Sequence, residues 1–351
     1  MAGEKIVLVS LGQKFNSSSI RDEYYKNITG YLKEQGFCVS VENGDEYDEY
    51  LTVKLLKDAD CAIFSSNGPM SRRVMEQLPR LKLITRYGIG LNSVDLDAAT
   101  EMGKAVCYTP GYCSEEIGIH AVAMGLAALR NIAYYDRMTR QGIWLKGNGP
   151  IPRRPWNMTI GIFALGASGS VVAKAMGQGF GAQIIAHDPY VKTETAKGLN
   201  VELVSFDELL ERSDMIFINA PLTKETHHIF NDSAFTKMKT GAILVNIARG
   251  GIIDTGALTR ALKTGKLSKA ALDVFEIEPL DPNTEFLRND FVTVTPHSAY
   301  YGQEAIEKAD FLLGRMPTRF FLEKKLYKRN LANPAIMEKL NDFTLLDQEV
   351  E

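Results

Sequence analysis

Three short segments in the second half of the chain place polar side chains directly after apolar runs. Arg249 follows the run 245–248, Glu278 precedes a proline, and His297 follows one. An arginine fork binds a carboxylate through two parallel hydrogen bonds. An imidazole paired with an acid exchanges a proton near neutral pH. The three side chains together therefore suit proton exchange with an oxygen that lies beside a bound carboxylate.

Each of the three side chains also has a structural interpretation. Arg249 could pair with a loop acid, and a single histidine at a strand end is more often structural than catalytic. Glu276 competes with Glu278 as the acid that pairs with His297. We favour the active-site interpretation, because a carboxylate-binding fork, an acid and an imidazole make a coherent chemical set.

A glycine-containing loop follows the apolar run 158–164. Gly166 lets the backbone approach a pyrophosphate closely, Gly169 lets the following helix pack on the strand, and the helix N-terminus attracts the anion. Ala164 stands where the usual fingerprint has its first glycine. Asp188 comes 19 residues after Gly169, where a carboxylate accepts ribose hydroxyls and repels a 2′-phosphate. The loop therefore predicts NAD rather than NADP, the alternative being that Asp188 only begins a turn.

The elements that must position these residues follow an α/β pattern. Short β-branched runs alternate with longer helical patterns, which predicts parallel sheets covered by helices. We expect a first series with helices over 19–35 and 71–78 and with strands over 5–10, 37–40, 60–65, 81–85 and 104–108. We expect a second series of six strands, over 158–164, 182–187, 214–219, 242–248, 269–274 and 291–295.

A long apolar helix, capped by Ser114, separates the two series, and the chain after residue 295 has a helical composition without strands. The length of 351 residues corresponds to about two domains. We expect residues 1–109 and 298–351 to form one domain and residues 110–297 to form the other. The small residues of the long helix fit close packing in a dimer, or burial within one chain, about equally well.

Composition excludes several classes of protein. Hydrophobic residues make up 45% of the chain and charged residues 24%, which is typical of globular proteins. A net charge of −3 argues against nucleic acid and anionic membranes as partners. No metal site is expected, because the five histidines and four scattered cysteines show no ligand spacing. The cysteines and the polar amino end favour a reducing cytoplasm without a signal peptide, and the apolar stretch 117–129 is too short to span a bilayer.

Taken together, these segments resemble the D-isomer-specific 2-hydroxyacid dehydrogenase family over about residues 60–302. Further markers of that resemblance are the segments 81–84, 88–90, 94–99 and 220–223. The resemblance implies an oxidoreductase of two Rossmann-like doubly wound α/β domains. One is a flavodoxin-like substrate domain (1–109 and 298–351), and the other is an NAD-binding Rossmann domain (110–297).

The resemblance also implies roles for single residues. Arg249 would grip the substrate carboxylate, helped by backbone groups of Gly88, Ile89 and Gly90. His297 would be the acid and base, and Glu278 its partner. The implied cofactor contacts, with Asp273 on the nicotinamide carboxamide, are Gly166, Ala167, Ser168, Gly169, Asp188, Ala220, Pro221, Thr226, Ile247, Ala248, Asp273 and His297.

The implied reaction is reversible hydride transfer between NADH and a small 2-oxoacid, by a cytoplasmic homodimer. D-3-phosphoglycerate dehydrogenase is the alternative within the family, although the loop 65–69 carries no cation for a phosphate. An NAD(H)-sensing module is the alternative from another class, because the segments 112–116 and 297–301 are similar to those of the C-terminal-binding-protein corepressors. Ala164 and Ile119 depart from the family pattern.

Overall fold

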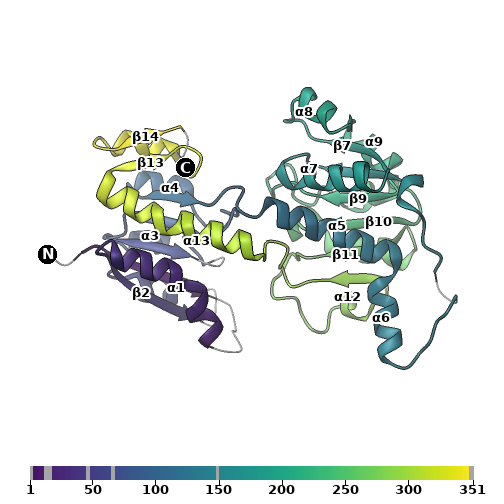
Figure 1. Ribbon diagram of the computed structural model, residues 1–351, viewed down its shortest axis with the longest axis horizontal. Helices are drawn as coiled ribbons and strands as arrows, with labels where there is room; N and C mark the ends of the chain where they lie inside the picture. Colours follow the sequence, from purple (N-terminus) through teal and green to yellow (C-terminus); the bar gives the residue numbers. More distant parts are fainter. Residues whose placement is uncertain (1–2, 12–17, 45–47, 65–67, 148–149, 348–351) are drawn as a thin grey trace. The chain divides into compact units, whose positions relative to one another are not determined.

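The computed structural model describes residues 3–11, 18–44, 48–64, 68–147 and 150–347. The chain divides into two compact units (Figure 1). Unit 1 comprises Met1–Tyr112 and Gln303–Glu351, and unit 2 comprises Cys113–Gly302. The purple and yellow ends of the chain thus belong to unit 1, and the teal and green middle to unit 2. Residue 65 of the third expected strand and residues 65–67 of the loop after it lie outside the described residues.

A five-stranded parallel sheet forms the centre of unit 1, in the order β2-β1-β3-β4-β5. This is the flavodoxin-like strand order. Every residue of β3 and β4 is buried, as expected for parallel strands that helices cover on both faces. The strands are β1 (Lys5–Leu11), β2 (Cys38–Gly44), β3 (Cys61–Phe64), β4 (Leu83–Arg86) and β5 (Ala105–Tyr108). The helices are α1 (Ser18–Glu34), α2 (Glu49–Leu56), α3 (Arg72–Glu76), α4 (Leu96–Glu101) and α13 (Gln303–Thr318).

The last part of unit 1 corrects one expectation. After α13 and the short helical stretch η4 (Arg319–Glu323), two three-residue strands, β13 (Lys325–Tyr327) and β14 (Thr344–Leu346), pair in parallel. The 3-10 stretch η5 (Pro334–Lys339) lies between them in the sequence. The expectation of a strand-free end was wrong, because three residues are too few to show the alternation that identifies a strand.

A seven-stranded parallel sheet forms the centre of unit 2, in the order β12-β11-β10-β9-β6-β7-β8. Six of its strands were expected. The seventh, β8, has two residues at the sheet edge and was missed for the same reason as β13 and β14. The strands are β6 (Thr159–Phe163), β7 (Gln183–His187), β8 (Glu202–Leu203), β9 (Met215–Ile218), β10 (Ala242–Asn246), β11 (Leu267–Leu272) and β12 (Val292–Val294).

The order of the strands reverses beside β6, which is where doubly wound sheets bind ligands. Neighbouring residues of the strands of unit 2 belong to two different apolar clusters. Phe217 and Ala271 belong to one cluster, and Ile216 and Leu272 belong to the other. The helices and short turns of this unit are α5 (Ser114–Arg130), α6 (Ile132–Arg140), η1 (Pro155–Asn157), α7 (Ala167–Ala173), η2 (Lys174–Gly179), α8 (Thr193–Gly198), α9 (Phe206–Arg212), α10 (Asp232–Lys237), η3 (Gly250–Ile252), α11 (Thr255–Lys263) and α12 (Glu285–Arg288).

Helix α5 begins one residue earlier than a cap at Ser114 requires. Cys113 is the N-cap residue and makes no side-chain cap hydrogen bond, so Ser114 is already the first helical residue. Glu115 and Glu116 in the first turn supply the negative charge that the helix dipole favours there. Four small residues of α5 are buried within unit 2, which favours packing inside one chain: Gly118, Ala121, Gly125 and Ala128.

No single helix among the described residues is long and apolar enough to cross a membrane. In the described part of the chain, the pair of helices α5 and α6 reaches that length and composition only when both are taken together, and the two are bent by 64° at the break between them.

Candidate active site

Arg249, Glu278 and His297 follow three neighbouring strands. They come after β10, β11 and β12, which are adjacent in the sheet of unit 2 and run parallel. Parallel strands end at the same edge, so the structure brings the three segments together at the carboxyl edge of this sheet.

The imidazole of His297 is paired with Glu278. The Nδ1 atom of His297 lies 2.7 Å from Oε2 of Glu278, and Oε1 of Glu278 accepts a hydrogen bond of 2.9 Å from the Phe275 backbone N–H. A carboxylate only accepts hydrogen bonds, so Nδ1 carries a hydrogen and Nε2 is the nitrogen that can exchange a proton. The backbone of His297 has a φ of 52°, in the left-handed region that residues other than glycine rarely adopt.

Glu276 is paired with a different histidine. Its Oε1 lies 2.5 Å from Nε2 of His228, and its Oε2 accepts the Thr255 backbone N–H at 3.0 Å. Burial alone would raise the pKa of Glu276, but the hydrogen bonds from Thr255 and His228 outweigh it and lower the pKa. The two acids that compete in the sequence therefore serve two different histidines.

The loop of Arg249 is held by a side chain that sequence reasoning missed. The fully buried Asn246 donates to the carbonyl oxygen of Arg249 and accepts the Ala248 N–H, both at 3.0 Å. The signal in the sequence is an amide within an apolar strand. A side chain at Gly250 would overlap the Phe275 carbonyl group, so glycine lets the Arg249 loop contact the loop that leads to Glu278.

The glycine-containing loop 164–169 has a backbone that suits a pyrophosphate. Helix α7 begins directly after Gly166, which is exposed, borders open space and makes no side-chain cap hydrogen bond to the helix. Gly169 is needed for close packing, because a Cβ there would overlap the carbonyl oxygen of Ala164. Ala164 has a φ of 75°, a left-handed conformation that glycine adopts without strain. The uncapped N–H groups at Ala167 and Ser168 therefore fit a dinucleotide.

Asp188 comes directly after β7 and contacts this loop. Its Oδ2 accepts the Leu165 N–H at 2.8 Å, and its Oδ1 accepts the N–H groups of Tyr190 and Val191 at 2.9 and 3.1 Å. The residue does begin a turn, which was the structural alternative. A carboxylate has about four acceptor positions, so one remains for a ribose hydroxyl.

Three further predicted cofactor residues, Ala220, Pro221 and Thr226, lie in the loop after β9. The Thr226 hydroxyl donates to the Pro221 carbonyl oxygen at 2.7 Å and accepts the Thr223 N–H at 2.8 Å. Ala220 is buried at the start of this loop, and Ile247 is buried in the loop after β10, next to the half-buried Ala248.

Asp273, the last predicted cofactor residue, is fully buried directly after β11. Its carboxylate accepts hydrogen bonds from Thr295, Ser298 and Ala299, the residues on either side of His297.

The predicted substrate loop Gly88–Gly90 lies in unit 1, directly after β4 and Tyr87. The Gly88 N–H donates to the Thr109 hydroxyl at 3.0 Å, and Nε of Arg86 donates to the Gly90 carbonyl oxygen at 3.0 Å. Ile89 between them is exposed. Its role in binding a carboxylate stays a prediction.

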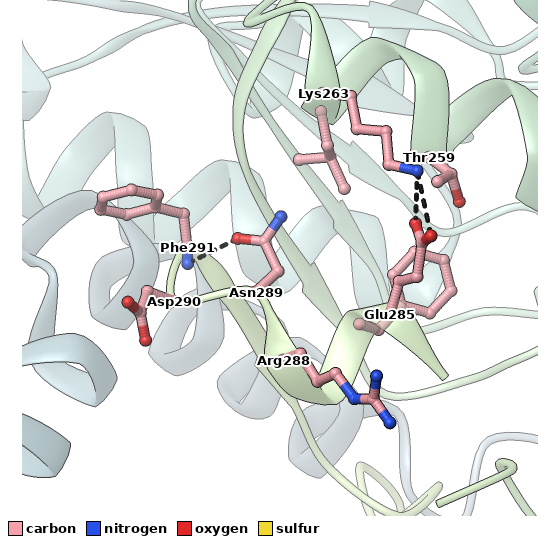
Figure 2. A pocket seen from close by; sticks show the side chains of 9 residues that line it. Thr259, Lys263, Glu285, Arg288, Asn289, Asp290 and Phe291 are labelled. Carbon is pink, nitrogen blue, oxygen red and sulfur yellow. Dashed lines mark hydrogen bonds and ion pairs between the residues drawn. The ribbon is translucent and has the colours of Figure 1, made fainter. Parts of the chain in front are cut away.

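One open cavity of unit 2, of about 520 Å³, lies elsewhere, beside α11 and α12 (Figure 2). Figure 2 shows the Lys263 ammonium group paired with Glu285, while Asp290 and Arg288 point apart from one another. The cavity contains none of the predicted site residues, and its side chains carry both signs of charge. Among the described residues, no group of three or more His, Cys, Asp or Glu side chains could hold a metal ion.

Comparisons with known proteins agree with this geometry. Residues 122–299 match the sequence model described as "D-isomer specific 2-hydroxyacid dehydrogenase, NAD binding domain". A D-3-phosphoglycerate dehydrogenase of Archaeoglobus fulgidus is 38% identical over 276 residues, or 78% of this chain and 51% of the relative. The chain thus spans about half the length of that relative. A glyoxylate reductase of Korarchaeum cryptofilum is 35% identical over 72% of this chain and 76% of the relative.

A solved structure is similar over nearly the whole chain. The crystal structure of D-lactate dehydrogenase from Aquifex aeolicus, complexed with NAD and lactic acid, superimposes with a TM-score of 0.76. It is 26% identical in sequence, and the match covers 93% of this chain and 99% of the other.

Proposed function

Because the chain belongs to the D-isomer specific 2-hydroxyacid dehydrogenase family, we propose that it is an NAD-dependent oxidoreductase of small 2-hydroxyacids. The observation that carries the proposal is the pair of His297 Nδ1 and Glu278 Oε2, 2.7 Å apart, at the sheet edge that also holds the Arg249 loop. An acid-oriented imidazole at the same sheet edge as an arginine, whose fork suits a carboxylate, supports reduction of a 2-oxoacid.

Bound NADH supplies the hydride for C2 of the oxoacid. Arg249 binds the substrate carboxylate through its planar fork and orients the carbonyl group. His297 delivers the proton on Nε2 to the carbonyl oxygen, and in the reverse direction takes it from the hydroxyl group. Glu278 holds the ring in one orientation and stabilises its protonated form. The uncapped N–H groups after Gly166 would bind the pyrophosphate and Asp188 the ribose.

We propose an unphosphorylated 2-oxoacid as the substrate. The ring of Tyr300 lies beside His297, with centroids 6.5 Å apart and planes at 78°, so an uncharged aromatic wall borders the imidazole. The alternative is 3-phosphohydroxypyruvate, because a phosphoglycerate dehydrogenase is 38% identical.

A substrate panel tests the proposal. NADH oxidation is followed by absorbance with glyoxylate, pyruvate, phenylpyruvate and 3-phosphohydroxypyruvate, and each assay is repeated with NADPH. We expect turnover with an unphosphorylated acid and NADH. The highest kcat/KM with the phosphorylated acid would identify the alternative, and tight NADH binding without any turnover would indicate a sensing module instead.

Replacing Arg249 by leucine should raise the KM for the oxoacid about 30-fold and lower kcat. The reason is that a hydrogen-bonded charged group contributes roughly 2 kcal/mol to binding a carboxylate. Steady-state kinetics on the variant measure both constants. Leucine at Arg288, an exposed arginine of α12, is the matched control and should leave both unchanged. Unaltered kinetics in the Arg249 variant would remove this residue from the proposed role.

We further propose that the protein is a homodimer joined through α6 and the segment after it. No residue of α6 is buried, and five large apolar side chains of this region are exposed: Ile132, Ile143, Trp144, Ile151 and Trp156. Trp144→Glu should then convert the dimer to a monomer in sedimentation equilibrium, whereas Tyr50→Glu, at an exposed tyrosine of unit 1, should not. A wild-type protein that sediments as a 39.0 kDa monomer would contradict the proposal.

Unit 1, which holds the Gly88–Gly90 loop, is the substrate domain in this proposal, and unit 2 binds NAD. We propose a cytoplasmic location, supported by the four cysteines, none of which forms a disulfide bond.

A further inference from the structure

A buried carboxylate anchors the loop that carries His297. Oδ1 of Asp273 accepts the Ser298 N–H at 2.9 Å, and Oδ2 accepts the Ala299 N–H at 3.0 Å. The Asp273 carbonyl oxygen accepts the His297 N–H at 2.8 Å. One residue therefore fixes the backbone of three consecutive residues.

The hydroxyl of Thr295 extends this anchor on the other side of His297. Its Oγ1 lies 2.5 Å from Oδ1 of Asp273 and 3.1 Å from Nε2 of His120. A hydroxyl has one hydrogen, and the carboxylate is a stronger acceptor than the Met124 sulfur 3.5 Å away. Thr295 therefore donates to Asp273, and its oxygen accepts a hydrogen bond from His120.

This assignment of donors and acceptors places a hydrogen on Nε2 of His120. The ring comes from α5, its Nε2 lies 3.6 Å from Oδ1 of Asp273, and a quarter of its side chain is exposed. The hydrogen bonds run in one direction, from His120 to Thr295 to Asp273, and end on the acceptor that holds the loop.

The loop needs such support because His297 has a positive φ of 52°. A left-handed backbone at a non-glycine residue costs about 1–3 kcal/mol and persists only where the surroundings determine it. Loss of one hydrogen bond to Asp273 would let the loop relax and move Nε2 of His297 away from the substrate.

We propose that His120 and Thr295 are positioning residues, which act through Asp273 to hold His297 in its reactive geometry. The proposal rests on the proposed function for its kinetic consequence, since His297 is there the proton donor. It assigns no contact with substrate or cofactor to either residue.

Conservative and non-conservative variants separate this role from simple packing. Thr295→Val keeps the shape and loses the hydroxyl, so kcat should fall on the order of tenfold, with KM for NADH nearly unchanged. Thr295→Ser should restore most of the rate. Gln at position 120 places an amide N–H where Nε2 of His120 lies, whereas Asn is too short, so His120→Gln should retain kcat and His120→Asn should lower it about fivefold.

A double variant tests whether His120 acts through Thr295. In the Thr295→Val background, His120→Asn should have no further effect on kcat, because the acceptor of its hydrogen bond is already gone. Multiplied losses in the double variant would show that the two residues act independently and would overturn the proposal.

A readout without cofactor or substrate separates this proposal from the proposed function. The protein has five histidines, so the ring signals of His297 can be assigned in a histidine-labelled NMR spectrum by comparison with His297→Asn. These signals should move in Thr295→Val and His120→Asn but not in His120→Gln. Moved signals in a protein that turns over no oxoacid would leave the inference standing without the proposed function. Unmoved signals and unchanged kcat in an active enzyme would overturn the inference alone.

Discussion

Replacing His297 by asparagine should reduce kcat about 10³-fold with every accepted oxoacid. A positioned general acid contributes about 10²–10⁴-fold to a rate, and asparagine cannot deliver a proton to the carbonyl oxygen. In the wild type, Nδ1 of His297 is paired with Glu278 at 2.7 Å, so Nε2 is the ring nitrogen that delivers the proton. Stopped-flow absorbance of NADH measures the loss, and quenching of protein fluorescence by NADH shows that cofactor binding is largely retained.

Two further variants make the His297 result specific. Glu278→Gln keeps an acceptor for Nδ1 and loses the charge that stabilises the protonated ring, so its loss of kcat should be smaller than that of His297→Asn. His227→Asn, at an exposed histidine, should leave kcat unchanged. If His297→Asn retains more than about a tenth of the wild-type kcat, His297 is not the general acid.

The second large effect concerns stability and pH. Asp310 on α13 is 7% exposed, and its Oδ1 has no hydrogen-bond partner among the described residues. Burial raises the pKa of Asp310 from 3.8 to about 7. The folded protein therefore keeps this proton between about pH 4 and 7 while the unfolded chain has lost it, so the free energy of unfolding falls as pH rises through this range.

Replacing Asp310 by asparagine should remove that loss. At 1.36 kcal/mol for each pKa unit, the variant should be up to about 4 kcal/mol more stable than the wild type at pH 8, and nearly equal to it at pH 4. Urea unfolding at a series of pH values measures the difference. Glu304→Gln, at an exposed acid of the same helix, should show no such trend. A difference between Asp310→Asn and the wild type that does not change with pH would show that folding does not raise the pKa of Asp310.

The sequence alone was sufficient for the parallel α/β architecture and for the segments that carry Arg249, Glu278 and His297. The central strands β6, β9 and β10 of unit 2 are buried over most or all of their length, so each is a mostly apolar run that can be recognised locally. A polar residue directly after such a run lies at the carboxyl edge of the sheet. This is why the three segments could be placed at one edge without knowledge of the strand order.

Hydrogen-bond partners could not be obtained in this way. Glu276 and Glu278 are two residues apart and chemically equivalent, and only the course of the loop gives one to His228 and the other to His297. Thr295 and His120 act on residues that lie on other elements, so their own neighbours in the sequence carry no sign of it. The strands β8, β13 and β14 form because a partner strand is present, since two or three residues have no stable strand conformation by themselves.

What the sequence by itself determined was therefore the type of the longer elements and a candidate set of reacting groups, because periodicity and residue chemistry are local properties. What only the tertiary structure decided was the partner of each group and the backbone strain at Ala164 and His297. Both depend on contacts between residues far apart in the chain. The reason is that a hydrogen bond requires its two atoms to lie within about 3 Å, and distances of that size are set by packing.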